Sequence, residues 1–121
     1  MFPRDVKEAI WQRDHGRCAW CGQHVHADWL GWSHHHRRPR GMGGSRRPDT
    51  NRPPNGVLLH GHGTVGCHHL VESLRAEALD RGFLVPQTLS PPHVAIDHAV
   101  HGLVWLTDDG GWTTTPPEEA W

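Results

Sequence analysis

Apolar residues near the start of the chain recur at the spacing of one helical face. Within residues 5–14, Val6 and Ile10 lie one helical turn apart, and polar residues fall between them. Asp5 and Glu8 have the three-residue spacing of a capping box, which is typical of a helix N-terminus. This pattern predicts a short N-terminal helix from Asp5 to about residue 14.

A longer helical pattern runs from Cys67 to about Arg81. Its apolar positions follow the 3.6-residue period, and Gly82 directly after it favours helix termination. The apolar stripe comprises Leu70, Val71, Leu74 and Ala78. The pattern predicts one continuous helix over residues 67–81.

Short apolar runs bounded by turn residues predict strands elsewhere in the chain. Residues 29–36 and 57–59 are the candidates in the middle of the chain, and residues 83–85 and 100–106 are those in its last third. The Asp-Gly-Gly sequence at 109–111 is a turn signal after the last candidate.

Segment 37–56 contains prolines and glycines at short intervals and is predicted to be a loop. A loop of this length without secondary structure of its own is uncommon in a compact domain and usually carries function. The middle of the chain is therefore expected to form strand, loop, strand and helix, an α+β arrangement. Histidines gather at the end of the first strand and at the start of the helix.

The composition indicates a small apolar core. Hydrophobic residues make up 36% of the 121 residues, so a domain of this size needs an additional stabilising link such as a disulfide or a bound metal ion. The cysteine count is three, an odd number, and the N-terminus lacks the apolar run of a signal peptide. We therefore expect a cytoplasmic protein without a disulfide scaffold and without a membrane span. Because the chain contains 13 histidines, we expect a bound metal ion to be this stabilising link.

The net charge of −1 conceals two segments of opposite charge. Between residues 34 and 52 six arginines stand against one aspartate, and residues 97–121 contain five acidic residues but no lysine or arginine. A basic stretch is typical of a polyanion site, and guanidinium groups suit bidentate contacts with phosphate. A solvated arginine-rich loop is the alternative interpretation.

Three cysteines and one histidine form a candidate metal site. Cys18-x-x-Cys21 presents two thiolates to one tetrahedral ion, and Cys67 supplies a third. The fourth ligand is His60 or His62, and we prefer His60 because it directly follows a predicted strand. A redox-active pair or unligated cysteines are the alternatives. We expect a structural zinc ion at this site, which would stabilise the small core.

A second histidine group consists of residues 34–36 and 68–69. Consecutive strand residues point to opposite faces, so neighbouring histidines act on two sides of a reacting group rather than on one ion. Taken alone, a solvent-exposed histidine run is the simpler interpretation. Six further histidines are expected at the surface or in turns: His15, His24, His26, His93, His98 and His101.

The order of these motifs resembles the HNH family of nucleases. The matching residues are His35-His36-Arg37-Arg38-Pro39, Gly43-Gly44, Asn55 before the run at 57–59, and Cys67-His68. The resemblance covers roughly residues 4–82. Members with paired knuckles carry two cysteine pairs, and here His60 stands in place of one cysteine of the second pair. The glycine-rich insertion before Cys67 is similar to a branch common in phage-encoded members.

The resemblance implies a small ββα-metal (His-Me finger) fold within an α+β chain. The nuclease core with its zinc knuckle would occupy residues 1–85, and residues 86–121 would form an extension of short strands with a frayed acidic tail. The implied activity is metal-dependent hydrolysis of DNA phosphodiester bonds that leaves a 5′-phosphate and a 3′-hydroxyl. A phage origin would place the protein in the host cytoplasm, with DNA and phage packaging proteins as partners.

The same resemblance implies roles for individual residues. His35 and His68 would bind one catalytic divalent ion, namely Mg, Mn, Ni or Zn, and His36 would be the general base that activates water. Asn55 would fix the loop and orient His36. Glu72 lies one helical turn after His68, either as a third ligand or, more simply, as a solvated residue.

The arginines proposed to hold DNA phosphates are Arg37, Arg38 and Arg40. Such contacts position a protein on DNA without reading its sequence. Most tryptophans are expected in the core or in a lid, with base stacking as the minority alternative. Two other functions compete with the nuclease: a zinc-stabilised nucleic-acid-binding module without catalysis, and a metallohydrolase of smaller phosphate esters.

Overall fold

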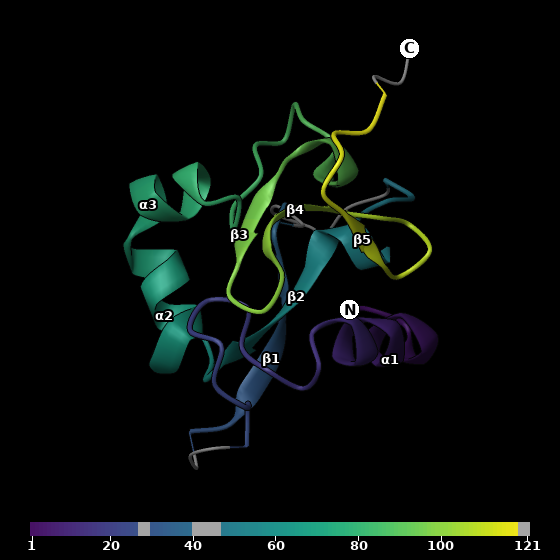
Figure 1. Cartoon of the computed structure of the whole chain (residues 1–121). Helices are drawn as coiled ribbons and strands as arrows, with labels where there is room; N and C mark the ends of the chain where they lie inside the picture. Colours follow the sequence, from purple (N-terminus) through teal and green to yellow (C-terminus); the bar gives the residue numbers. More distant parts are fainter. Residues whose placement is uncertain (27–29, 40–46, 119–121) are drawn as a thin grey trace.

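The computed structural model of the chain describes residues 1–26, 30–39 and 47–118 (Figure 1). It is a mixed α+β structure in which a few helices accompany two small antiparallel sheets. The elements in chain order are α1 (Arg4–Arg13), β1 (Trp32–His36), the 3-10 helix η1 (Pro53–Asn55), β2 (Gly56–His60), α2 (Gly66–Ser73), α3 (Arg75–Asp80), the 3-10 helix η2 (Pro91–His93), β3 (Ile96–His98), β4 (Gly102–Leu106) and β5 (Trp112–Thr113).

Strands β1 and β2 form the first sheet, in which Trp32 pairs with His60 and His36 pairs with Gly56. Helices α1 and α2 both contact β2, and Figure 1 shows them on opposite sides of this sheet. Alternate side chains of β1 therefore face different helices. The ring of His35 contacts a histidine of α2, whereas the ring of His36 stacks on Phe2 just before α1. The expected division of neighbouring histidines between two faces is confirmed.

Helix α1 forms where the apolar pattern predicts it, but it begins differently. It starts at Arg4 with Pro3 in the N-cap position, and no side chain caps it. The capping box predicted from Asp5 and Glu8 is therefore wrong. Pro3 precedes the first turn instead. The first N–H groups of a helix have no partner within the helix, and proline has no N–H group that would need one.

The single helix predicted over residues 67–81 is wrong, because the chain forms α2 and α3 with a break at Leu74. The backbone of Leu74 has φ −100° and ψ 60°, outside the helical region. Val71 and Ala78 are buried, but Leu70 and Leu74 of the predicted apolar stripe are exposed. Val71 of α2 and Ala78 of α3 both belong to the hydrophobic core cluster.

One hydrophobic core joins the two sheets, and its members range from Phe2 to Leu106. Val57, Leu58 and Leu59 of β2 are its centre, and Ile96 and Val104 pack into the same cluster from β3 and β4. Strands β3, β4 and β5 form the second sheet in that order. The C-terminal part of the described chain thus contributes directly to the core.

The chain segment after α3 is buried without forming the strand predicted at 83–85. Gly82 turns the chain with φ +82°, and a Cβ there would lie 1.9 Å from the backbone oxygen of Ala95. Phe83 and Leu84 then fill the core as irregular backbone, while the backbone N–H of Val85 donates to Arg37. The unpredicted strand β3 forms further along, against β4.

A buried carboxylate links α1 to both sheets. Asp14 accepts hydrogen bonds from Arg13 Nε at 2.8 Å, from His98 Nε2 at 2.9 Å and from the backbone N–H of Leu58 at 2.9 Å. Burial alone would raise the pKa of Asp14, but the charge of Arg13 and the hydrogen bond from His98 outweigh it and lower the pKa well below its usual value. The expectation that His98 lies at the surface or in a turn is wrong, since its ring is buried in this network.

None of the helices in the described parts of the chain combines the length and the apolar character needed to cross a bilayer.

Candidate metal centres and the pocket beside them

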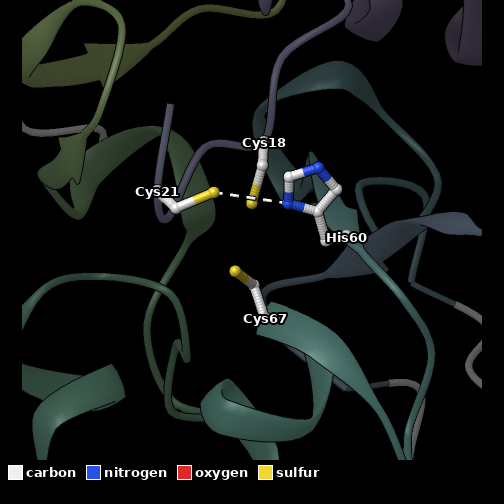
Figure 2. Close-up of side chains that lie close together, drawn as sticks. All are labelled: Cys18, Cys21, His60 and Cys67. Carbon is white, nitrogen blue, oxygen red and sulfur yellow. Dashed lines mark hydrogen bonds between the residues drawn. The ribbon is translucent and has the colours of Figure 1, made fainter. Parts of the chain in front are cut away.

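Three cysteines and one histidine from three parts of the chain meet beside the end of β2 (Figure 2). Cys18 and Cys21 come from the turn after α1, His60 ends β2, and Cys67 lies in the first turn of α2. Their four ligand atoms all lie within 4.8 Å of one another. Three sulfur atoms and one imidazole nitrogen are a complete ligand set for a tetrahedral ion, so this group could hold a metal.

The orientation of His60 suits it to this role. Its Nε2 donates a hydrogen bond to the backbone oxygen of His24 at 2.9 Å, so Nδ1 carries the lone pair. Nδ1 lies 3.3 Å from the sulfur of Cys21. His62 lies outside the group, and its Nδ1 contacts Thr64 instead. Of the two histidines considered from the sequence, the structure places His60 at the cysteines.

A tight turn within residues 61–66 brings His60 and Cys67 together. Gly61 has φ +76°, and a Cβ on it would lie only 2.1 Å from the backbone oxygen of Val65. Only glycine fits so close an approach of two backbone segments. The glycines before α2 are therefore part of what closes the cluster.

The three thiols lie close enough to shift one another's pKa values. The hydrogen bond from Cys67 lowers the pKa of Cys18 to about 5, and the same bond raises the pKa of Cys67. Burial raises the pKa of Cys21. Thiolates this close repel one another strongly, so a cation among them is what allows all three to ionise.

A second ligand group lies between β1 and α2. His35 of β1 and His68 and Glu72 of α2 bring their ligand atoms within 4.8 Å of one another. The carboxylate of Glu72 is 3.5 Å from His68 Nε2. The Glu72 side chain is 43% exposed, so Glu72 is the solvated helix residue expected from the sequence and also lies within reach of the two histidines.

Both histidines of this group are oriented and neutral. His35 Nε2 donates to the backbone oxygen of Phe83 at 2.8 Å, which leaves the lone pair on Nδ1. His68 Nδ1 lies 2.9 Å from the hydroxyl of Ser33, so Nε2 faces the carboxylate. Burial lowers the pKa of His35 to about 3 and also lowers the pKa of His68. Neutral imidazoles held by such partners are the form that binds a divalent ion.

A pocket of about 420 Å³ opens beside this second group. His36 lines it from the opposite face of β1, and its Nε2 lies 2.8 Å from Asn51 Oδ1. An amide oxygen only accepts, so Nε2 carries the proton and Nδ1 has the lone pair. The His36 ring also stacks on Phe2 at 4.0 Å, which fixes its plane. The remaining lining residues are His34, His35, Pro39, His68, Glu72 and Arg75.

Asn55 holds the loop between β1 and β2. Its Nδ2 donates to the backbone oxygens of Arg38 and Thr50, and its Oδ1 accepts from the backbone N–H of Arg38 at 2.7 Å. It thus joins the two ends of the loop, as expected from the sequence. The side chain that hydrogen-bonds His36 is Asn51, which sequence reasoning missed because nothing marks one asparagine of this loop above another.

The predicted roles of Arg37 and Arg38 as phosphate contacts are wrong. The guanidinium of Arg37 is fully buried and donates to four backbone oxygens, those of Pro54, Gly82, Pro91 and Val94. Arg38 is also buried and donates to Leu89 and Asp49. Both side chains tie loops together and face the interior. Arg40 and the Gly43-Gly44 pair lie outside the described residues.

Arg75 is the exposed arginine that the structure places at the pocket. It opens α3, lines the pocket and forms no hydrogen bond or ion pair with any described residue. On one continuous helix the i, i+4, i+7 spacing of His68, Glu72 and Arg75 would put all three on one face, but the break at Leu74 separates Arg75 from the other two, so the tertiary arrangement brings it to the pocket. Positive charge at this position can hold an anion beside the ligand group.

Replacing Arg37 by alanine is expected to destabilise the fold by about 3 kcal/mol or more, because four backbone oxygens lose their donor. The matched variant Arg75→Ala is expected to change the free energy of unfolding by less than about 0.5 kcal/mol. Urea denaturation followed by circular dichroism measures both. Equal stability of the two variants would show that Arg37 is not the internal tie described here.

A third group, formed by Asp14, His98 and His101, also has its ligand atoms within 4.8 Å. Its groups are already engaged: Asp14 binds Arg13, both ring nitrogens of His98 have partners, and His101 Nε2 donates to the backbone oxygen of Arg13 at 2.7 Å. The buried positive charge of Arg13 beside this group opposes the binding of a metal cation. This network is a structural link between α1 and the second sheet.

Comparison of the chain with known protein families, with curated proteins and with solved structures finds no match.

Proposed function

We propose that this protein is a metal-dependent DNA endonuclease of the ββα-metal type. One observation carries the proposal. On a single short strand, His35 joins a ligand group with His68 and Glu72, while its neighbour His36 faces the same pocket from the other side of the strand. Phosphodiester hydrolysis needs these two functions side by side: a cation for the developing charge and a base for the water.

The order of the elements supports the same proposal. Strands β1 and β2 pair, α2 follows them directly, and the ligand group spans β1 and α2. This is the arrangement that the resemblance to HNH nucleases predicts. A nucleic-acid-binding module without catalysis has no need of an oriented base beside two neutral histidines, which favours the enzyme over that alternative.

The chemistry can be assigned to individual side chains. A divalent ion held by His35, His68 and Glu72 would supply positive charge to the phosphate oxygens. His36 Nδ1 takes the proton of the water that attacks phosphorus, and the bond to the 3′-oxygen breaks opposite the attacking oxygen. Asn51 keeps the His36 proton on Nε2 before this step and remains its acceptor when the ring becomes charged. Arg75 holds a non-bridging oxygen of the phosphate.

We further propose that Cys18, Cys21, His60 and Cys67 bind a structural Zn²⁺ ion. Thiolate and imidazole are the ligands that zinc prefers, and all four positions of a tetrahedral site are filled by protein, as in structural sites. The ion would join the turn after α1, the end of β2 and the start of α2. Because it anchors α2, it also holds His68 opposite His35.

The nuclease proposal is tested with supercoiled plasmid DNA in the presence of Mg²⁺, Mn²⁺, Ni²⁺ or Zn²⁺. At least one ion should support nicking by the parent protein, and His68→Ala should lower the rate about 100-fold because the ligand group loses a member. His69→Ala is the matched control. His69 adjoins His68 but is exposed, contacts Gly63 and Ser73, and lies outside the ligand group.

The outcomes separate the competing functions. DNA binding without cleavage under any ion would support the zinc-stabilised binding module and overturn the enzyme. Hydrolysis of small phosphate esters without plasmid cleavage would support the metallohydrolase. Equal loss of activity in His68→Ala and His69→Ala would contradict the assigned ligand group.

A further inference from the structure

A line of aromatic side chains leads away from the pocket over the α1 face of β1. We call it the aromatic row, and its members are Phe2, Trp11, His24, His26, Trp32 and His34. The ring centroids of Trp32 lie 5.1 Å from those of both His34 and Trp11, and His24 and His26 lie 5.3 Å apart. Neighbouring rings are thus spaced closely enough to form one continuous apolar surface.

Much of this surface is accessible. Trp32 is 36% exposed, and His24 and His26 are exposed, whereas Phe2 is buried and joins the aromatic row to the hydrophobic core. Trp11 packs against the core only in part. Large aromatic rings at the surface usually mark a recognition site, because water contact with so much apolar area is unfavourable unless a partner covers it.

The aromatic row is continuous with the proposed active site. His34 lines the pocket and its ring contacts Trp32. Phe2 contacts the His34 ring and stacks on the proposed base His36. A strand whose phosphate lies in the pocket therefore has the aromatic row directly beside it.

The charges along the aromatic row suit a polyanion. Lys7 and Arg17 adjoin the aromatic row through their backbones, because His34 Nε2 donates to the backbone oxygen of Lys7 and the backbone of Arg17 pairs with that of His24. The Arg17 guanidinium donates to the backbone oxygen of Gly22 at 3.1 Å. Among the described residues, no salt bridge involves Lys7, Arg17 or any member of the aromatic row. Aromatic rings with basic residues nearby are a combination by which proteins bind single-stranded nucleic acids.

We propose that the aromatic row stacks unpaired bases of single-stranded DNA whose scissile phosphate lies in the His36 pocket. This inference rests on the proposed nuclease function and names its substrate class. Bases within a duplex are already stacked on one another, so they cannot lie against Trp32 and Trp11. The enzyme therefore prefers single strands, flaps or unpaired junctions over intact duplex.

Binding is measured by fluorescence anisotropy with a fluorescein-labelled 12-mer of thymidine, in a His36→Ala background that cannot consume the probe. Trp32→Ala is expected to weaken binding about tenfold, and Trp32→Phe should retain most of it because a ring remains. Trp112→Ala is the matched control. Trp112 is 44% exposed and also stacks on a histidine, His101, but it lies in β5 of the other sheet.

Two further probes isolate stacking from charge. An abasic strand of the same length should bind more weakly to the parent protein and should not respond to Trp32→Ala. A duplex of the same length should bind more weakly than the single strand. Equal affinities of Trp32→Ala and Trp112→Ala for the thymidine 12-mer, or tighter binding of the duplex, would overturn the proposal.

A second measurement distinguishes failure of the aromatic row from failure of the nuclease. In the parent background, Trp32→Ala should lower the ratio of single-strand cleavage to bis(p-nitrophenyl) phosphate hydrolysis about tenfold, because the small ester carries no base. If cleavage occurs but the ratio is unchanged, base stacking by the aromatic row is contradicted and the proposed nuclease function is retained. Trp32-dependent binding without any cleavage would support the aromatic row and overturn the nuclease.

Discussion

Alanine in place of His36 is expected to lower the rate of DNA cleavage by about 10²- to 10⁴-fold without unfolding the protein. The reason is its position. The His36 ring is fixed by Phe2 on its face and by Asn51 at Nε2, and it lines the pocket opposite the ligand group. No metal ligand is removed by this change, so the loss would report the proton transfer alone. Plasmid nicking under single-turnover conditions measures the rate.

Two substitutions of Asn51 test the same step through smaller changes in the cleavage rate. Asn51→Ala should slow cleavage about tenfold, because the ring loses the acceptor that sets its tautomer and plane. Asn51→Asp retains an acceptor oxygen and should recover most of the rate. His93→Ala, an exposed histidine that contacts the backbone of Glu118, serves as the control with unchanged rate. Cleavage by His36→Ala at the parent rate would remove His36 from the mechanism.

Loss of His60 is expected to unfold the protein, whereas loss of His62 is not. Binding of a structural zinc ion is worth about 10 kcal/mol or more in small domains, which is comparable to the whole stability of a protein this size. His60→Ala and Cys18→Ala should therefore lose the bound ion and the cooperative unfolding transition. His62→Ala, two residues further along and outside the cysteine cluster, should retain one zinc per chain.

Metal content by mass spectrometry and circular dichroism measure this pair of variants. A strong zinc chelator should unfold the parent protein in the same way. A folded His60→Ala protein with full zinc content would exclude His60 as a ligand. His68→Ala should keep the zinc bound at the cysteines, since the two ligand groups share no residue.

Several features of the site follow from the sequence because short-range rules suffice for them. The opposite directions of His35 and His36 come from the two-residue period of a strand, whereas the pairing of the two strands was implied by the family resemblance. The cysteine cluster follows from the chemistry of thiols, since only one set of three cysteines exists in the chain. His60 was preferred over His62 because a residue ending a strand has a fixed direction, and the structure agrees.

Other features depend on which distant segments come together. The capping pattern at Asp5 is a valid local signal, but Pro3 provides the helix start. The break at Leu74 divides α2 from α3, and the apolar period alone does not distinguish two such helices from one straight helix. Asn51, which lies 15 residues after His36, becomes its partner only in the folded chain.

The arginines show most clearly which features the sequence determines and which the tertiary structure decides. The sequence by itself determines that a positively charged stretch follows the histidines, together with the strand, helix and thiol pattern of a small metal-binding α+β chain. It does not determine where each charge points. Arg37 binds the backbone oxygens of residues up to 57 positions away, whereas Arg75 remains at the surface beside the pocket. A buried guanidinium needs acceptors that only the folded chain assembles, so its role is decided by tertiary structure.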